Sequence, residues 1–347
     1  MVSLPPEILL NVVSQVSDEY REMAFDSAKD EIAVMKRTLM NLCLSSKIFY
    51  TVAQPVLHRI FSNSNELDEY TDEDRLPRKT GSRTYRQTTR TENFIRTLIQ
   101  RPDLADGVED IKLEDFQNND VPCDFDTTML PFDPLLGDLF MGASMVVPRP
   151  SPGLVRQWLG DEEDGRRIQE WQDDWRDELQ TGGRNAQIAL LFILTPNLVR
   201  LEMESSKRGF GPCVDDLWEQ MLGPRSERTV ICHGVNLGVD AQLRSQAPTP
   251  PTIFSSLEDL IVTSKPNGDG VVLKSVKRLL PLPSLRLFYG INLEERGGLD
   301  SMRLYYRLPL MHLEYLQLEE CTIDDMVLRT LIEACPNLKN LDPASPM

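Results

Sequence analysis

The residues that could perform nucleophilic or metal chemistry are few and scattered along the chain. The sequence contains three histidines and six cysteines, and no two cysteines form a CxxC pair. Cys232 and His233 are adjacent, but adjacency in sequence does not make a thiolate–imidazole pair, and a buried cysteine near a turn is the simpler interpretation. The segment Gly209–Pro212 lacks the Gly-Lys-Ser/Thr ending of a phosphate-binding loop. We therefore predict no catalytic residue, no cofactor and no metal.

The overall charge also excludes some classes of partner. The 347 residues include 54 acidic and 37 basic side chains, a net charge of −17, which repels phosphates and argues against nucleic acid. The longest apolar run is Ile188–Leu194, far short of the roughly twenty residues that cross a bilayer. Residues 1–7 contain no basic residue typical of a signal peptide. Widely spaced cysteines are typical of reduced thiols, so we predict a cytoplasmic and/or nuclear protein without membrane contact.

Short helices are predicted over residues 1–61. Pro5 and Pro6 suit the start of a helix, where a missing N–H group costs nothing. The apolar residues that follow at helical spacing are Ile8, Leu9, Val12, Val13 and Val16. A second apolar run covers residues 39–61, within which Pro55 is expected to break or kink the helix. So many large apolar side chains on so little chain predict a partner helix or groove.

This segment resembles the F-box, in the form common in fungal F-box proteins. The matching stretches are Leu4-Pro5-Pro6-Glu7-Ile8-Leu9, the leucines and Phe49 of residues 39–49, and Ala53, Pro55, His58 and Arg59. F-boxes bind the small adaptor subunit of SCF (Skp–cullin–F-box) ubiquitin ligases, and through it the cullin scaffold. The resemblance implies adaptor contacts, as apolar anchors in a groove, for Leu4, Pro5, Ile8, Leu9, Leu39, Leu42 and Phe49.

Two features depart from the family pattern. The connection over residues 17–36 is longer than the usual loop, and Phe49 stands where many members carry tryptophan. The alternative interpretation of residues 1–61 is an ordinary helical hairpin inside a globular core.

A charged linker is predicted over residues 62–92. Residues 66–74 hold six acids and residues 75–90 hold six bases, without periodicity, which is typical of an exposed, mobile hinge.

Residues 117–160 are rich in proline and predict a long irregular loop. Trp171 and Trp175 lie four residues apart, so we expect them to hold an inserted helix against the body.

Internal repeats organise the rest of the chain. The pattern LxxLxL begins at residues 198, 257, 285 and 313, returns in shortened form at 338, and has a weaker copy at 108. Steps of 28, 28 and 25 residues lie in the range of leucine-rich repeats. The last two leucines of each copy predict a short strand with alternate side chains in the core, and residues 186–194 and 323–334 predict helices opposite. The repeats resemble the leucine-rich repeats that follow F-boxes; the alternative is an α/β domain with coincident leucine spacing.

Together these features predict an α/β protein with three parts. A short all-helical F-box-like module (1–61) and the charged linker are followed by an irregular leucine-rich-repeat solenoid of parallel strands and helices (93–347), with insertions around 117–185 and 204–252. No repeat buries its apolar face alone, so the repeats must stack. By register, the exposed strand positions, expected to bind a protein target, are Lys112, Glu202, Ile261, Tyr289 and Gln317.

The resemblance implies a non-catalytic substrate-recognition subunit of an SCF-type E3 ubiquitin ligase. The F-box would bind the adaptor and the repeat arc would bind an unknown target. No RING or catalytic cysteine domain is visible, so ubiquitin transfer itself would belong to other subunits. The alternative is a non-catalytic leucine-rich-repeat scaffold whose N-terminal helices only cap the solenoid. An enzyme with a site spread over loops has no positive support in the sequence.

Overall fold

The computed structural model describes a little over half of the molecule, in separate stretches. The described residues are 29–63, 78–80, 83–85, 89–114, 132–146, 173–205, 253–264, 271–276, 279–295 and 312–343, with positions 11, 15, 210, 211, 213–215, 217 and 218.

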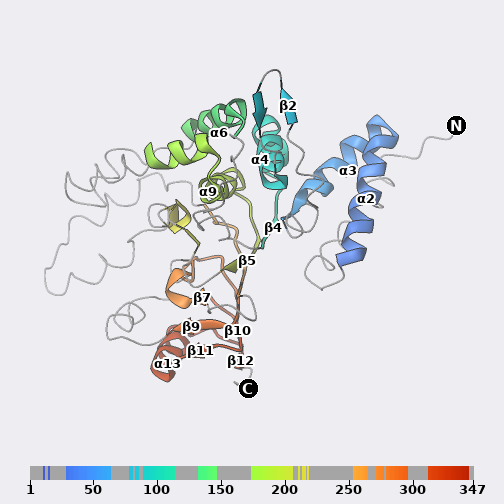
Figure 1. Ribbon diagram of the computed structural model, residues 1–347. Helices are drawn as coiled ribbons and strands as arrows, with labels where there is room; N and C mark the ends of the chain where they lie inside the picture. Colours follow the sequence, from blue (N-terminus) through green and yellow to red (C-terminus); the bar gives the residue numbers. More distant parts are fainter. Residues whose placement is uncertain are drawn as a thin grey trace, which may run out of the picture.

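A seven-stranded parallel sheet forms the body of the protein (Figure 1). Its strands, in spatial order, are β1 (Ile60–Ser62), β4 (Asp110–Leu113), β5 (Arg200–Ser205), β6 (Asp259–Ser264), β8 (Leu287–Ile291), β10 (Tyr315–Glu319) and β12 (Asn340–Pro343). Each strand pairs in parallel with the next, and their order in space is their order in the chain. The molecule is therefore an α/β protein with a parallel sheet, as predicted.

The leucine pattern explains why these strands form. In β6, β8 and β10 the buried side chains alternate with partly exposed ones, as in a strand with one face in the core. One row of the core face runs through Ile111, Leu201, Leu260, Phe288 and Leu316. These five side chains are 0–1% exposed, so each repeat contributes one large apolar group to a continuous core.

A second, three-stranded parallel sheet repeats the same geometry. Its order is β11 (Thr322–Ile323), β9 (Leu293–Glu295), β7 (Val271–Val272). Asn292 and Glu320, with φ of 54° and 53°, turn the chain from β8 into β9 and from β10 into β11. These two turns lie 28 residues apart, so the period seen in the sequence is also the period of the backbone.

Helices cover one side of the sheet. They include α4 (Arg90–Gln100), α5 (Pro102–Ala105), α9 (Arg184–Leu194) and α13 (Asp325–Glu333), with the short 3₁₀ helix η2 (Leu273–Ser275). Figure 1 shows α9 and α13 on the same side of the sheet. The predicted helix at residues 186–194 is confirmed, and residues 186–192 are wholly buried. The helix predicted at 323–334 is confirmed over Asp325–Glu333, whereas Ile323 belongs to β11.

Residues 132–146 are more regular than expected. Helix α6 (Pro134–Val146) lies inside the stretch predicted as an irregular loop, so that prediction is wrong there. Pro134 stands at the first helical position, where its missing N–H group is tolerated. Residues 173–181 are helical, and Trp175 is 3% exposed, its Nε1 donating to the carbonyl of Ala186 at 3.0 Å. Trp175 therefore holds this helix to the body as predicted, while Trp171 lies outside the described residues.

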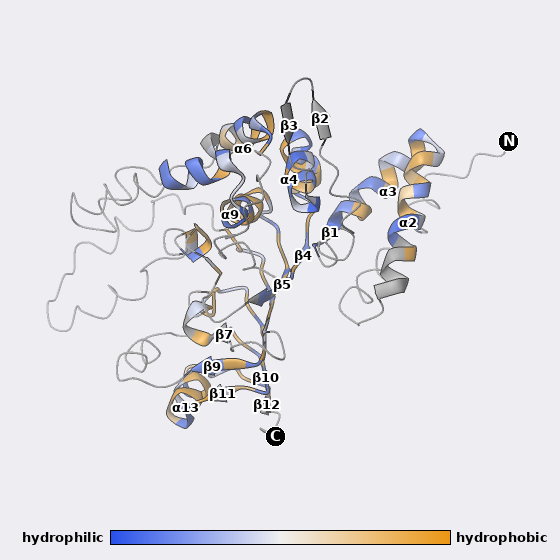
Figure 2. Cartoon of the chain, viewed as in Figure 1, coloured by the Kyte–Doolittle hydropathy of each residue, from blue (hydrophilic) through white to orange (hydrophobic). Residues whose placement is uncertain are grey.

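Two helices that pack against each other precede the sheet and are called the helical module below: α2 (Lys29–Ser45) and α3 (Lys47–Arg59). The connection expected over residues 17–36 is thus helical from Lys29 onward. Leu39 and Ala53 form its small core, and Figure 2 shows hydrophobic residues along both helices. Pro55 does not end α3, so the predicted break is absent, and the apolar residues around Pro55 pack on Leu39 and Ala53.

Regular structure also enters the predicted linker. Strands β2 (Arg78–Thr80) and β3 (Arg83–Tyr85) pair as an antiparallel hairpin, and α4 begins at Arg90. The boundary expected after residue 61 falls inside β1, which belongs to the main sheet.

Candidate functional site

Exposed apolar side chains gather on the helical module. Of the eight large hydrophobic side chains exposed in the described chain, five lie on α2 and α3: Val34, Met40, Leu44, Ile48 and Tyr50. Met40 and Leu44 are four residues apart and therefore share one face of α2. Leu44 is 82% exposed, and Ile48, 53% exposed, follows in the first turn of α3. These residues have the chemistry of a protein-binding surface.

The residues predicted to bind an adaptor are only partly at this surface. Leu39 is fully buried between α2 and α3, which makes it part of the module's own core and corrects its expected role as a contact. Leu42 and Phe49 are half-buried, and Ser46 Oγ caps α3 by accepting a hydrogen bond from the Phe49 N–H at 3.3 Å. The expected contacts Leu4, Pro5, Ile8 and Leu9 lie outside the described residues.

Leu44 and Ile48 were not among the expected contacts. The helical spacing of α2 alone cannot distinguish its buried stripe from its exposed one, because that depends on where α3 packs. The structure supplies this information through the pairing of Leu39 with Ala53.

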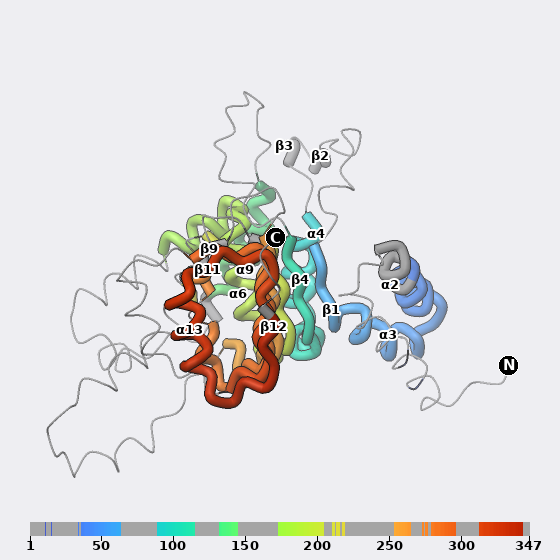
Figure 3. Tube along the Cα trace, turned by 90° about the horizontal axis from the view of Figure 1, so that it is seen from below, coloured from blue at the N-terminus to red at the C-terminus, as the bar shows by residue number. Residues whose placement is uncertain are grey.

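The five residues predicted on the exposed strand positions form one row across the sheet. Lys112, Glu202, Ile261, Tyr289 and Gln317 are register partners from β4 to β10, and Asp342 extends the row in β12. All five are partly exposed. In Figures 1 and 3, α9 and α13 lie on one side of the sheet, whereas α2 and α3 lie on the other. We call the face that carries this row the strand face.

The N-terminal part of the strand face is lined by ion pairs. Lys112 Nζ lies 2.7 Å from Glu202 Oε1 and 3.8 Å from Glu114 Oε1. Arg200 Nε lies 3.0 Å from Asp259 Oδ2 on the neighbouring strand. Each base here is therefore matched by an acid within the protein.

The C-terminal half of the strand face has a different composition. Its positions on β6 after Asp259 and on β8, β10 and β12 are Ile261, Thr263, Leu287, Tyr289, Ile291, Tyr315, Gln317, Glu319, Asn340 and Asp342. Apolar and aromatic side chains occupy the middle, two acids lie toward the carboxyl ends of the strands, and none of these positions holds a base. The nearby bases Arg286 and Lys339 lie at the amino ends of the strands, where Lys339 Nζ pairs with Glu314 Oε2 at 2.7 Å.

Tyr289 lies at the centre of this half. Burial raises the pKa of its phenol, and so do a hydrogen bond to the Glu319 carboxylate and the negative charges of Glu319 and Asp342. Gln317 Nε2 donates to Glu319 Oε1 at 2.9 Å, which orients that carboxylate. The region combines a neutral phenol with concentrated negative charge.

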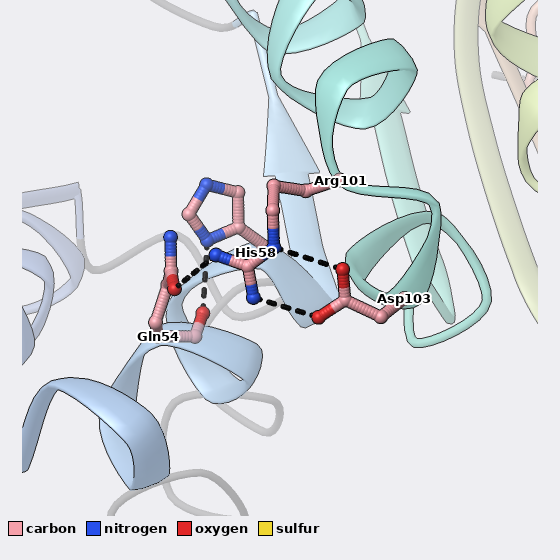
Figure 4. Close-up of polar contacts among 4 residues, drawn as sticks. All are labelled: Gln54, His58, Arg101 and Asp103. Atoms are coloured by element: carbon pink, nitrogen blue, oxygen red, sulfur yellow. Dashed lines mark hydrogen bonds and ion pairs between the residues drawn. The ribbon is translucent and has the colours of Figure 1, made fainter. Parts of the chain in front are cut away.

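A packed junction joins the helical module to the sheet. Arg101, at the corner between α4 and α5, donates from Nη1 to Gln54 Oε1 of α3 at 3.1 Å (Figure 4). Its Nε and Nη2 donate to the two carboxylate oxygens of Asp103 at 2.8 and 2.7 Å. These hydrogen bonds raise the pKa of Arg101 and lower that of Asp103, so both stay charged. His58 Nδ1 lies 2.8 Å from the Gln54 carbonyl oxygen, and burial lowers the pKa of its imidazole.

The junction continues through β1. The Glu109 N–H donates to the Arg59 carbonyl at 2.9 Å, and the Arg59 guanidinium pairs with the Glu109 carboxylate at 2.5 Å. Asn63, 3% exposed, exchanges hydrogen bonds with the Glu114 backbone, donating at 3.2 Å and accepting at 2.7 Å. Phe94 of α4 stacks on Phe61 with ring centroids 4.3 Å apart. The module and the sheet are thus one continuous packed body.

Sequence reasoning missed this junction. Its partners lie about fifty residues apart and follow no spacing rule. The only local signal was the polar pair Ser62 and Asn63 directly after two apolar residues, Ile60 and Phe61.

Other kinds of site find no candidate in the part of the chain that the structure describes. No group of three His, Cys, Asp or Glu side chains there is placed to hold a metal ion. None of the helices described is both long and apolar enough to span a membrane.

Comparisons with known proteins add no relative. No family model matches the chain, and neither a curated protein nor a solved structure is significantly similar to it.

Proposed function

We propose that this chain is the substrate-recognition subunit of an SCF-type E3 ubiquitin ligase. The helical module, as the F-box, would bind the adaptor subunit and through it the cullin scaffold. The strand face, as the inner surface of a leucine-rich-repeat arc, would bind a protein target. Such a receptor acts in the cytoplasm or nucleus and carries no cofactor.

One observation carries this proposal: α3 passes directly into β1, the first strand of the parallel sheet. The helical module and the strand face are therefore parts of one packed body, in which α2 and α3 lie on the side of the sheet away from α13 (Figure 3). A receptor works by holding its target near the ubiquitin-charged enzyme, which raises the target's effective concentration. A fixed connection between two binding surfaces suits that task better than a flexible one.

The strand order supports the repeat part of the proposal. Parallel strands that follow the chain one by one, with matching turns 28 residues apart, are typical of leucine-rich repeats. The resemblance of residues 1–61 to the F-box supports the module part.

The test is co-expression with the SCF adaptor subunit followed by size-exclusion chromatography. We expect a one-to-one complex that is lost in the double variant Leu44→Glu, Ile48→Glu. Both side chains are exposed, so these changes should leave the fold intact, which circular dichroism would check. Met326→Glu on α13 is the matched control, because Met326 and Ile48 are each 53% exposed.

A second candidate is a scaffold whose helices cap the sheet, and the pairing of β1 with β4 favours it. Deleting residues 1–61 cannot separate the two, because the deletion removes part of β1 under either interpretation. The co-expression experiment does separate them. A monodisperse wild-type protein that does not bind the adaptor would contradict the receptor and leave the cap as the remaining interpretation.

A further inference from the structure

The C-terminal half of the strand face has an uneven balance of charge. Glu319 and Asp342 carry negative charge there, and no base occupies any of its positions on β6, β8, β10 or β12. In the N-terminal part, by contrast, Lys112 and Arg200 are matched by Glu202 and Asp259 at 2.7 and 3.0 Å. Among the described residues, acids therefore neutralise the bases of the first part, whereas the strands of the second part offer no base to Glu319 and Asp342.

Apolar surface accompanies this charge. Ile261, Leu287, Tyr289 and Ile291 are partly exposed, and Tyr315 is 43% exposed. Partly exposed aliphatic and aromatic groups in the middle of a face, with polar groups at its border, have the anatomy of a protein-binding surface.

The chemistry of the occupant follows from these two features. An aliphatic or aromatic side chain would be buried against Ile261 and Ile291. A lysine or arginine beside it would form charge-assisted hydrogen bonds with Glu319 and Asp342 and a cation–π contact with Tyr289. Because the net charge of the chain is −17, a basic segment is also attracted over longer distances.

We propose that the C-terminal half of the strand face binds a basic segment of the target protein, in which lysines or arginines flank an aliphatic or aromatic residue. The proposal rests on the proposed function and specifies the chemical class of its target. A second copy of this chain is the competing occupant.

The experiment is selection of random short peptides, displayed on phage, against the immobilised full chain. We expect enrichment of peptides with lysine or arginine on both sides of a large apolar residue. Binding of an enriched peptide, followed by fluorescence anisotropy, should weaken as salt is raised because exposed charges are screened. The double variant Tyr289→Ala, Glu319→Lys should weaken binding of the peptide by about tenfold or more, because it removes the aromatic anchor and reverses the charge that attracts the basic residues.

The control is Glu333→Lys on α13, which makes the same change of charge on the helical side of the sheet. It should retain wild-type binding, and circular dichroism should show that all variants are folded. Enrichment of neutral or acidic peptides, enrichment of none, or equal losses in both charge-reversal variants would overturn the proposal. A dimer in light scattering that Tyr289→Ala, Glu319→Lys dissociates would assign the face to a second copy, and would also overturn it.

The two proposals fail separately. Peptide preference retained without adaptor binding would contradict the SCF receptor and keep the basic-segment site. Adaptor binding without the peptide preference would contradict only the site.

Discussion

Gln54 on α3 accepts a hydrogen bond from Arg101, 47 residues away in the chain, across 3.1 Å. Gln54 is only 9% exposed, so this contact satisfies an oxygen that has little access to water. Arg101 is in turn held by both carboxylate oxygens of Asp103 on α5. The side chains of Gln54, Arg101 and Asp103 together therefore orient α3 against α4 and α5.

The junction should weaken in mild acid because of His58. Burial lowers the pKa of His58 below the ordinary 6.5, and the charge of Arg101 acts in the same direction, while the Gln54 carbonyl opposes them. Above pH 6.5 the imidazole is neutral in both the folded and unfolded states. As the pH falls below 6.5 the unfolded chain binds the proton first, so stability falls until the pH passes the folded-state pKa.

The variant His58→Phe should keep a ring beside Phe94, on which His58 stacks with centroids 6.1 Å apart, and should lose this part of the pH dependence. Urea unfolding of both proteins between about pH 5 and pH 8 measures the difference. If the free energy of unfolding changed with pH by the same amount in both proteins, His58 would not titrate in this way.

Glu92 should be essential for packing α4 against α9. It is 1% exposed; its Oε2 accepts from the Thr89 N–H at 2.9 Å and its Oε1 accepts from Gln187 Nε2 at 3.0 Å. Glu92→Gln replaces one acceptor with a donor, so one of the two N–H groups loses its partner, at a cost of about 1–3 kcal/mol. Denaturant unfolding should show this loss. Adding Gln187→Glu restores a matched pair and should recover stability; a double variant no better than the single one would refute this pairing.

Gly290 should tolerate no side chain. It is buried in β8, and a Cβ atom there would lie 2.3 Å from Leu293 Cδ1 and 3.0 Å from Leu293 Cγ. Since Leu293 is fully buried, Gly290→Ala should destabilise the protein by about 1–3 kcal/mol through overpacking. Gly142→Ala in α6 is the control: a Cβ there meets nothing within 4 Å, and helix propensity predicts a gain of up to about 1 kcal/mol. Equal melting temperatures for the two variants would contradict the packing of Leu293 against Gly290.

Leu39 and Leu44, five residues apart on α2, should separate stability from binding. Leu39→Ala removes the centre of the module's small core and should cost about 2–5 kcal/mol, whereas Leu44→Ala at an 82% exposed position should stay within about 0.5 kcal/mol. For Leu44→Ala we expect weaker adaptor binding although the stability of the protein is unchanged. Thermal unfolding and adaptor co-elution of both variants provide the measurement, and loss of stability in Leu44→Ala would place that side chain in a core.

The repeat body was predictable because its signal is periodic. Leucines that return at steps of 28, 28 and 25 residues occupy the same place in each repeat, so the strands from β6 onward and the positions Ile261, Tyr289 and Gln317 follow from spacing. Lys112 and Glu202 stand 90 and 59 residues before the next position of the row, so they follow from the LxxLxL pattern of their own segments. The structure agrees in register at every one of these positions.

The misjudged segments are those where local composition conflicts with packing. The prolines around α6 suggested a loop, although Pro134 occupies a helix start and Phe140 is wholly buried. Pro55 suggested a break, although α3 continues past it to Arg59. Strand β1 has no LxxLxL pattern, and only its pairing with Asp110–Lys112 identifies it as a strand. The candidate site was predictable in the same uneven way. The row of strand positions follows from the repeat pattern, whereas the ion pairs and the exposed helix faces depend on partners far away in the chain.

The position of β1 at the end of the sheet also bears on solubility. A strand edge with free N–H and C=O groups invites pairing with another molecule, and here β1 occupies the edge that β4 would otherwise present. Because β1 follows α3 without a break, the helical module that is proposed to recruit one partner also protects the repeats from unwanted ones. Cutting the chain after residue 63 would thus do more than remove a binding module: it would expose β4 and favour edge-to-edge aggregation of the remainder.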